Sequence, residues 1–117
     1  MKYMLLIYGN EAAAAQASEA DLHAEGAAYE VFTKSIVDSG NFLDGDPFLP
    51  TSAAKTLRVR DGQTQTAQGP AVATSPEQLL AYYKVEADGP EAALGFAARI
   101  PGARHGSIEV RPVMTFD

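Results

Sequence analysis

The chain has 117 residues, 46% of them apolar, and its 15 acidic and 9 basic side chains give a net charge of −6. This length predicts one domain with a small hydrophobic core. The acidic balance argues against nucleic acid and against an anionic membrane surface as partners, because both favour a basic protein surface. The chain has no cysteine, which excludes disulfides, thiolate nucleophiles and cysteine-ligated zinc.

The beginning of the chain predicts a buried strand. Residues 2–8 form an almost continuous apolar and aromatic run, which is typical of a strand that is covered on both faces. The run is shorter than a membrane span, and no small-residue cleavage site of a secretory signal follows it. We therefore expect a cytoplasmic protein. Residues 9–17 are polar and alanine-rich, and we expect them to form a loop.

Residues 18–38 predict an amphipathic helix. Ser18 suits the capping position, acidic residues occupy the first turn, and Ser39-Gly40-Asn41 ends the helix. The apolar stripe at helical spacing consists of Leu22, Tyr29, Phe32 and Ile36. The opposite face carries His23, Glu30, Lys34 and Asp38. The spacing of Glu30 and Lys34 predicts an ion pair.

The middle of the chain predicts a β-hairpin. We expect a short strand at residues 42–43 and a loop at residues 44–52, which are rich in glycine and proline. Two alternating runs over residues 55–67 then flank Asp61-Gly62, a strong signal for a two-residue hairpin turn. This turn pairs Arg60 with Gln63 and Arg58 with Gln65. The other side of the hairpin then carries Leu57, Val59, Thr64 and Thr66.

The last third predicts a strand, a helix and a final strand. Residues 79–87 alternate, and residues 107–113 form the last strand. Between them, Asp88 is expected to cap a helix that Pro101-Gly102 stops. The buried stripe of that helix consists of Pro90, Ala93, Leu94, Ala97 and Ile100. The order of elements predicts one α+β domain over residues 1–117, a ferredoxin-like unit with an inserted hairpin.

Two helices cover only one face of such a sheet, and we expect charged side chains on the other. They are Arg58, Arg60, Lys84, Glu86, Glu109 and Arg111. Either this face is solvated and its charges pair across strands, or it meets the same face of a second subunit. We favour a homodimer. In a cavity between the subunits, Arg58, Tyr83 and Glu109 are candidate ligand-binding residues.

Few side chains offer recognisable catalytic chemistry. His105, in the turn before the last strand, is either a candidate general base or a turn residue that bonds a backbone carbonyl. His23 is expected on the surface. Ser107 lies close to His105, but the sequence identifies no acid that orients such a pair. The tyrosines are interpreted as core residues or as the aromatic lining of a pocket, namely Tyr8, Tyr29, Tyr82 and Tyr83.

No motif for a metal or a cofactor is present. The two histidines lack ligand spacing, and the glycines mark turns rather than a phosphate-binding loop. The G-x-S-x-G motif of serine hydrolases is also absent. We therefore expect neither a metal nor a cofactor.

The chain resembles the YCII-related proteins, in particular their DGPF branch. Three segments carry the resemblance, KYMLLIYG at residues 2–9, RVRDG at 58–62 and RIPGARHGSIEVRPV at 99–113. The resemblance implies a dimeric α+β barrel built from ferredoxin-like units. It also implies a regulatory partner such as a sigma factor, because members of this branch are often associated with sigma-factor regulation.

Two departures from the family pattern affect the expected chemistry. The Asp-Gly-Pro-Phe motif that names the branch stands here as Gln68-Gly69-Pro70-Ala71, which keeps the turn and loses the carboxylate and the aromatic ring. Gln68, Gly69 and Pro70 remain candidate ligand-binding residues by their motif position. Asp88-Gly89-Pro90 matches the letters of the motif but lies at the start of the second helix, so it is not the corresponding site. More distant YCII proteins carry a proposed catalytic pair of His and Asp. The corresponding positions here are Tyr29 and residues 100–102, so the pair is not carried over.

Three functions are compatible with this sequence. The chain is a small dimeric ligand-binding or accessory protein, a cofactor-free enzyme acting on a small organic molecule, or a protein that keeps the fold after its ancestral site has decayed. The enzyme would use His105 or Tyr83 together with Arg58 or Glu109. The loss of the motif's carboxylate and aromatic ring favours the first and third alternatives.

Overall fold

Six strands and three helices make up the chain in a computed structural model, which describes residues 1–116. In chain order they are β1 (Lys2–Gly9), α1 (Glu11–Ala14), α2 (Glu19–Asp38), β2 (Phe42–Pro47), β3 (Lys55–Arg60), β4 (Gln63–Gln68), β5 (Gln78–Glu86), α3 (Pro90–Arg99) and β6 (Ser107–Pro112). Two short 3-10 helices, η1 (Thr51–Ala53) and η2 (Pro101–Arg104), precede β3 and β6.

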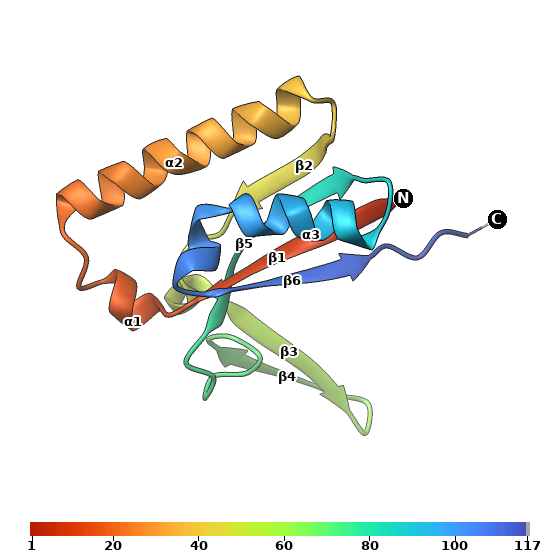
Figure 1. Cartoon of the computed structure of the whole chain (residues 1–117). Coiled ribbons are helices and arrows are strands. Elements are labelled where there is room, and N and C mark those ends of the chain that lie inside the picture. The colour runs from red at the N-terminus through yellow and green to blue at the C-terminus, as the bar shows by residue number, and fades with distance from the viewer. Residues whose placement is uncertain (117) are drawn as a thin grey trace.

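Four of the strands form one antiparallel sheet. Its order is β2-β5-β1-β6, so the first and the fifth strand of the chain lie at its centre. The helices α2 and α3 lie across one face of this sheet (Figure 1). This order and this layering confirm the predicted ferredoxin-like α+β fold. None of the helices described for residues 1–116 is both long and apolar enough to cross a bilayer.

The core lies between the sheet and the two long helices. Alternate residues of β1 are buried because successive side chains of a strand point to opposite faces. The buried residues that meet there are Tyr3, Leu5, Ile7, Phe32, Ile36, Tyr83, Val85, Ala87, Ala93, Ala97 and Ile100. All come from β1, α2, α3 or the ends of β5 and α3, so the hydrophobic effect fixes both helices on this face.

The hairpin β3–β4 follows its sequence prediction. Asp61 and Gly62 both have positive φ, 52° and 73°, as a type I′ turn requires. The register pairs Arg58 with Gln65 and Arg60 with Gln63, as predicted. However, the hairpin is a separate two-stranded sheet that projects from the body of the molecule (Figure 1). Arg58 and Arg60 therefore do not lie on the open face of the main sheet, contrary to the prediction.

Two segments predicted as loops are more regular than expected. The stretch after β1 contains α1, because the Asn10 side chain accepts a hydrogen bond from the Ala13 N–H at 3.0 Å and caps the turn. Strand β2 extends to Pro47, beyond the predicted residues 42–43. A strand at the edge of the sheet tolerates this proline because one side of its ladder needs no partner.

Three local expectations about the helices are wrong. Lys34 pairs with Asp38 at 2.5 Å, one turn later in the helix, and not with Glu30. The residue that caps α3 is Gly89 and not Asp88, and it makes no side-chain capping bond. Leu94 is 56% exposed, since α3 packs on the sheet through the small residues Ala93 and Ala97.

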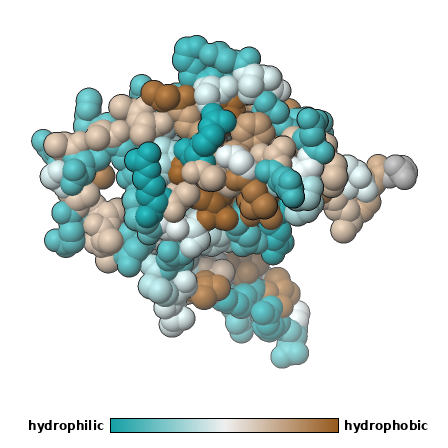
Figure 2. All heavy atoms as spheres, in the orientation of Figure 1, coloured by the Kyte–Doolittle hydropathy of each residue, from teal (hydrophilic) through white to brown (hydrophobic). Residues whose placement is uncertain are grey.

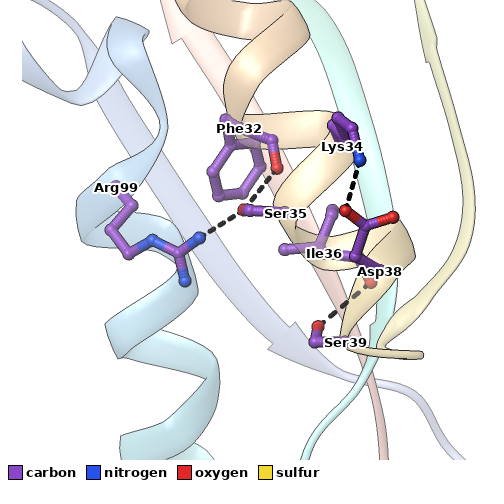
Figure 3. A network of polar contacts seen from close by, with 7 residues as sticks. All are labelled: Phe32, Lys34, Ser35, Ile36, Asp38, Ser39 and Arg99. Atoms are coloured by element: carbon purple, nitrogen blue, oxygen red, sulfur yellow. Dashed lines mark hydrogen bonds and ion pairs between the residues drawn. The ribbon is translucent and has the colours of Figure 1, made fainter.

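Polar contacts join α2 to α3 at the edge of the core (Figure 3). The Arg99 guanidinium donates a hydrogen bond to the Ser35 hydroxyl, which donates in turn to the Phe32 carbonyl oxygen at 2.6 Å. The same guanidinium lies 5.5 Å from the centre of the Phe32 ring and 5.9 Å from that of Phe96. Arg99 thus combines a hydrogen bond with cation–π contacts and fixes the spacing of the two helices.

Candidate functional site

A cleft of about 1090 Å³ opens between α1, α2 and the sheet. Its floor is formed by β1, β2 and β5, and one end is lined by Gly102 of η2 and by His105, which follows η2. The walls are apolar and aromatic, with Ile7, Leu22, Val37, Phe42, Leu80 and Tyr83 among the lining residues. Concave sites with such walls and a few polar groups are typical of small-molecule binding.

The short helix α1 is held against the rest of the fold by one side chain. The Glu11 carboxylate accepts hydrogen bonds from the Thr51 hydroxyl at 2.5 Å and from the Thr51 N–H at 2.9 Å. These two bonds, the hydroxyl bond first, lower the pKa of Glu11 below the usual glutamate value. Because α1 supplies Ala13 and Ala14 to the cleft wall, this contact attaches one wall of the cleft to the rest of the fold.

Tyr29 places a hydroxyl group in the cleft. The Gly102 N–H donates to the Tyr29 oxygen at 3.2 Å, and a Cβ atom at position 102 would lie only 2.7 Å from that oxygen. Burial raises the pKa of Tyr29 against the opposing effect of the Gly102 N–H bond, and the negative charge of Glu25 acts in the same direction as burial. The hydroxyl stays neutral, and its own hydrogen meets no acceptor among residues 1–116, so it is available to a ligand.

The floor of the cleft is a rigid aromatic cluster. Tyr83 is 8% exposed and its hydroxyl forms a 2.6 Å hydrogen bond with the Thr33 hydroxyl. The rings of Phe32 and Phe42 meet Tyr83 edge to face, with centroids 5.2 Å and 6.3 Å away. Because the Tyr83 hydroxyl is already hydrogen-bonded to Thr33, we interpret Tyr83 as an aromatic lining residue and not as a catalytic acid.

An imidazole and a carboxylate meet at the mouth of the cleft. The Nε2 atom of His105 lies 2.8 Å from Oε1 of Glu25. Glu25 lies in α2 and His105 lies in the turn after η2, so the fold brings together two residues that are far apart in the sequence. A carboxylate that holds an imidazole in one orientation is the arrangement that general-base catalysis uses.

The predicted site residues separate into two groups. Tyr83 and His105 line the cleft. Glu109 and Pro70 line a second cavity of about 780 Å³ formed with the loops before β3 and β5, and Glu109 accepts a hydrogen bond from Arg111 at 2.6 Å. Tyr8 lines both cavities.

Three predicted residues hold loops together. Arg58 donates to the Ala71 carbonyl oxygen at 3.3 Å, and the Gln68 side chain donates to the Ser52 carbonyl oxygen at 2.6 Å. Gly69 has a positive φ of 106°, which suits glycine, and its carbonyl oxygen accepts from the Thr56 hydroxyl at 2.8 Å. In this chain, neither Arg58 nor Glu109 reaches His105 or Tyr83 in the cleft.

Sequence reasoning missed Glu25 and Thr33. Together with Tyr29 they stand four residues apart along α2, which places all three on one face of the helix. Two polar side chains, each four residues from Tyr29 of the apolar stripe, could have been recognised in the sequence. The contact of Glu25 with His105 was not readable, because the two residues are 80 positions apart.

The two positions expected for the family's His and Asp are in contact. Tyr29 and Gly102 occupy them, and neither has the expected chemistry. The Glu25–His105 pair lies beside them, one helical turn before Tyr29 and three residues after Gly102. For metals, no three His, Asp or Glu side chains are grouped as ligands anywhere in the described part of the chain.

Comparison with known proteins agrees with the architecture. The sequence model of the YCII-related domain matches residues 1–117. An uncharacterized protein of Rhizobium meliloti (strain 1021) is 30% identical over 118 residues, which cover 99% of this chain and 94% of that protein. The chain therefore belongs to the YCII-related domain family.

Proposed function

We propose that this protein binds a small organic molecule in the cleft between α2 and the sheet. The observation that carries the proposal is that apolar walls, the Tyr29 hydroxyl and the Glu25–His105 pair share one cleft. Its volume of about 1090 Å³ is at the upper end of small-molecule sites. The second cavity offers a less favourable site, because its Ser107 hydroxyl already bonds Glu77 at 2.8 Å and Glu109 already bonds Arg111.

Chemical-shift mapping with a library of small organic fragments tests this proposal. We expect fragments to shift the amide resonances of α1, α2 and β5 around the cleft. Ala13→Trp places an indole in the cleft and should abolish those shifts, whereas Ala12→Trp, on the same helix but outside the lining, should preserve them. Fragments that shift only the residues of the second cavity would contradict the proposal.

One observation favours a second candidate function, that of a cofactor-free enzyme. The Glu25–His105 pair gives the cleft a base positioned at its mouth, although Arg58 and Glu109 do not join it. A general base at this position abstracts a proton from carbon next to a carbonyl group, a step to which such a base contributes about 10²–10⁴-fold.

Deuterium uptake by phenylacetone in heavy water distinguishes enzyme from binding protein. In the enzyme, His105→Ala loses at least about 100-fold of the exchange above background. His23→Ala keeps it, because His23 is an exposed histidine of α2 outside the cleft lining. Equal background exchange in all three proteins would leave binding as the function of the cleft.

We also propose that the functional unit is a homodimer in which the hairpin of each chain covers the open sheet face of the other. The support is the exposed apolar side of the hairpin and the acidic balance of the open face. Leu57 and Val59 share that side of the hairpin with Lys55, whereas the open face carries the carboxylates of Asp44, Asp46, Glu86 and Glu109 against the cations of Lys84 and Arg111. The assignment to the DGPF branch and a sigma factor as regulatory partner stay predictions from the resemblance.

A further inference from the structure

Carboxylates dominate the charged side chains of the cleft. Asp21, Glu25 and Glu30 reach it from α2. Against these three, Lys34 is the one Lys or Arg among the described lining residues, and its ammonium group lies 2.5 Å from the Asp38 carboxylate. An anionic ligand would therefore meet repulsion without a free cation to pair with.

Asp21 and Glu30 are the cleft carboxylates that are free to act on a ligand. Glu25 is bonded to His105. Neither Asp21 nor Glu30 forms an ion pair with any residue in the described part of the chain. Their charges thus remain uncompensated at the edge of the cleft, and Glu30 directly follows Tyr29 in α2.

The walls increase the effect of this charge. Low-dielectric walls strengthen the attraction between a carboxylate and a cation inside a cleft, and aromatic faces attract cations through their quadrupole. Phe42 and Tyr83 supply such rings in the lining. The apolar walls favour a ligand with an apolar body, and the carboxylates favour a ligand that carries a cationic group.

We infer that the ligand of the cleft is an organic cation, an apolar or aromatic molecule that carries an ammonium group. This inference rests on the proposed function of the cleft and adds the chemical class of the ligand. It excludes carboxylates and phosphates of similar size as preferred ligands.

Three probes of matched shape test the ligand class, namely phenethylamine, phenethyl alcohol and hydrocinnamate. They carry a positive, a neutral and a negative group on the same phenyl body. In amide NMR titrations of the full chain at low salt, we expect phenethylamine to bind about tenfold more tightly than hydrocinnamate, with the alcohol between them. Added salt should narrow the difference, because ions screen exposed charges.

Two variants tie the preference to the cleft. Glu30→Gln should weaken phenethylamine binding about three- to tenfold and leave phenethyl alcohol unchanged. Glu19→Gln removes the same charge from the same helix outside the cleft lining, and it should change neither affinity.

The outcomes separate the ligand class from the site. If hydrocinnamate binds as tightly as phenethylamine while phenethyl alcohol shifts the cleft amides, the ligand class is overturned and the proposed binding function stands. If none of the three probes shifts the cleft amides in the folded protein, both are overturned.

Discussion

At the scale of single residues, Gly102 is the position where the site tolerates least change. A methyl group there meets the Tyr29 oxygen at 2.7 Å and Ile7 at 3.4 Å. We expect Gly102→Ala to displace the Tyr29 ring, break its bond to the Gly102 N–H and lower the free energy of unfolding by about 1–2 kcal/mol. Urea denaturation measures the loss. Gly26→Ala is the control, since open space surrounds that helical glycine and alanine there should stabilise by about 0.5–1 kcal/mol. Equal stability of the two variants would contradict the role of Gly102.

Tyr82 gives a second prediction at this scale. The two carboxylates of Asp44 and Asp46 share its one hydroxyl hydrogen, with their oxygens 3.0 Å and 3.1 Å from the hydroxyl oxygen. The Asp44 bond, followed by desolvation and the Asp46 bond, raises the pKa of Tyr82 to about 12. Because the proton is held in the folded state, this contribution to stability is present below the ordinary tyrosine pKa and is lost as the pH rises through about 12.

An absorbance titration of tyrosinate measures this shift, with Tyr82→Phe identifying the component that belongs to Tyr82. Asp44→Asn should bring that component back toward about 10, the usual tyrosine value. Asp38→Asn removes one carboxylate that does not touch Tyr82 and should leave it in place. A Tyr82 component that titrates with the exposed tyrosines in the unmodified chain would show that the bonds do not persist in solution.

At the scale of elements, the attachment of α1 depends on pH. The pKa of Glu11 is lowered in the folded state, so its two bonds to Thr51 stabilise the fold fully above the unfolded glutamate pKa. That stability is lost as the pH falls from about 5 through the lowered pKa. We expect α1 to detach first, because each of its residues is at least partly exposed and none is buried.

Hydrogen exchange of the α1 amides, followed from neutral to acid pH, measures this detachment. Glu11→Gln should lower the protection factors of these amides, the intrinsic exchange rate divided by the observed rate, at neutral pH and remove the pH dependence of the protection factors, at a cost of roughly 1 kcal/mol or less because the carboxylate is partly solvated. Glu91→Gln is the matched control, since Glu91 also lies in the first turn of a helix. Protection factors of α1 that depend on neither pH nor Glu11 would show that this contact does not hold the helix in place.

The elements also show which features the sequence can predict. The hairpin was predictable residue by residue, because Asp61-Gly62 fixes the turn and the turn fixes the register. The attachment of α1 to the rest of the fold was not, because it depends on the contact between Glu11 and Thr51, which are 40 positions apart. The cleft has the same limit. His105 was identifiable as a candidate from the sequence. Its partner Glu25 was identifiable only from the structure, in which the turn after η2 lies against α2.

At the scale of the whole molecule, the chain is a plate of 48 × 47 × 18 Å with helices on one face only. The uncovered face of such a plate offers more than the roughly 800 Å² that each partner buries in a stable dimer. Leu57 and Val59 of the hairpin are 61% and 55% exposed, and Figure 2 shows hydrophobic surface on the projecting part. A two-stranded hairpin is marginally stable alone, and the proposed dimer would cover it with the open face of a second copy.

Sedimentation equilibrium provides the test of this dimer. We expect twice the mass of the chain at micromolar concentration, and monomers for Val59→Glu, because a carboxylate there buries an unpaired charge against the acidic face of the partner. Val31→Glu makes the same change at a 72% exposed position of α2, away from the hairpin, and should remain dimeric. Far-UV circular dichroism confirms that both variants fold. A monomeric wild-type chain would leave the hairpin free for a different protein partner, whereas a dimeric Val59→Glu would move the interface away from the hairpin. Either result replaces the crossed arrangement, since that arrangement requires Val59 at the centre of the contact.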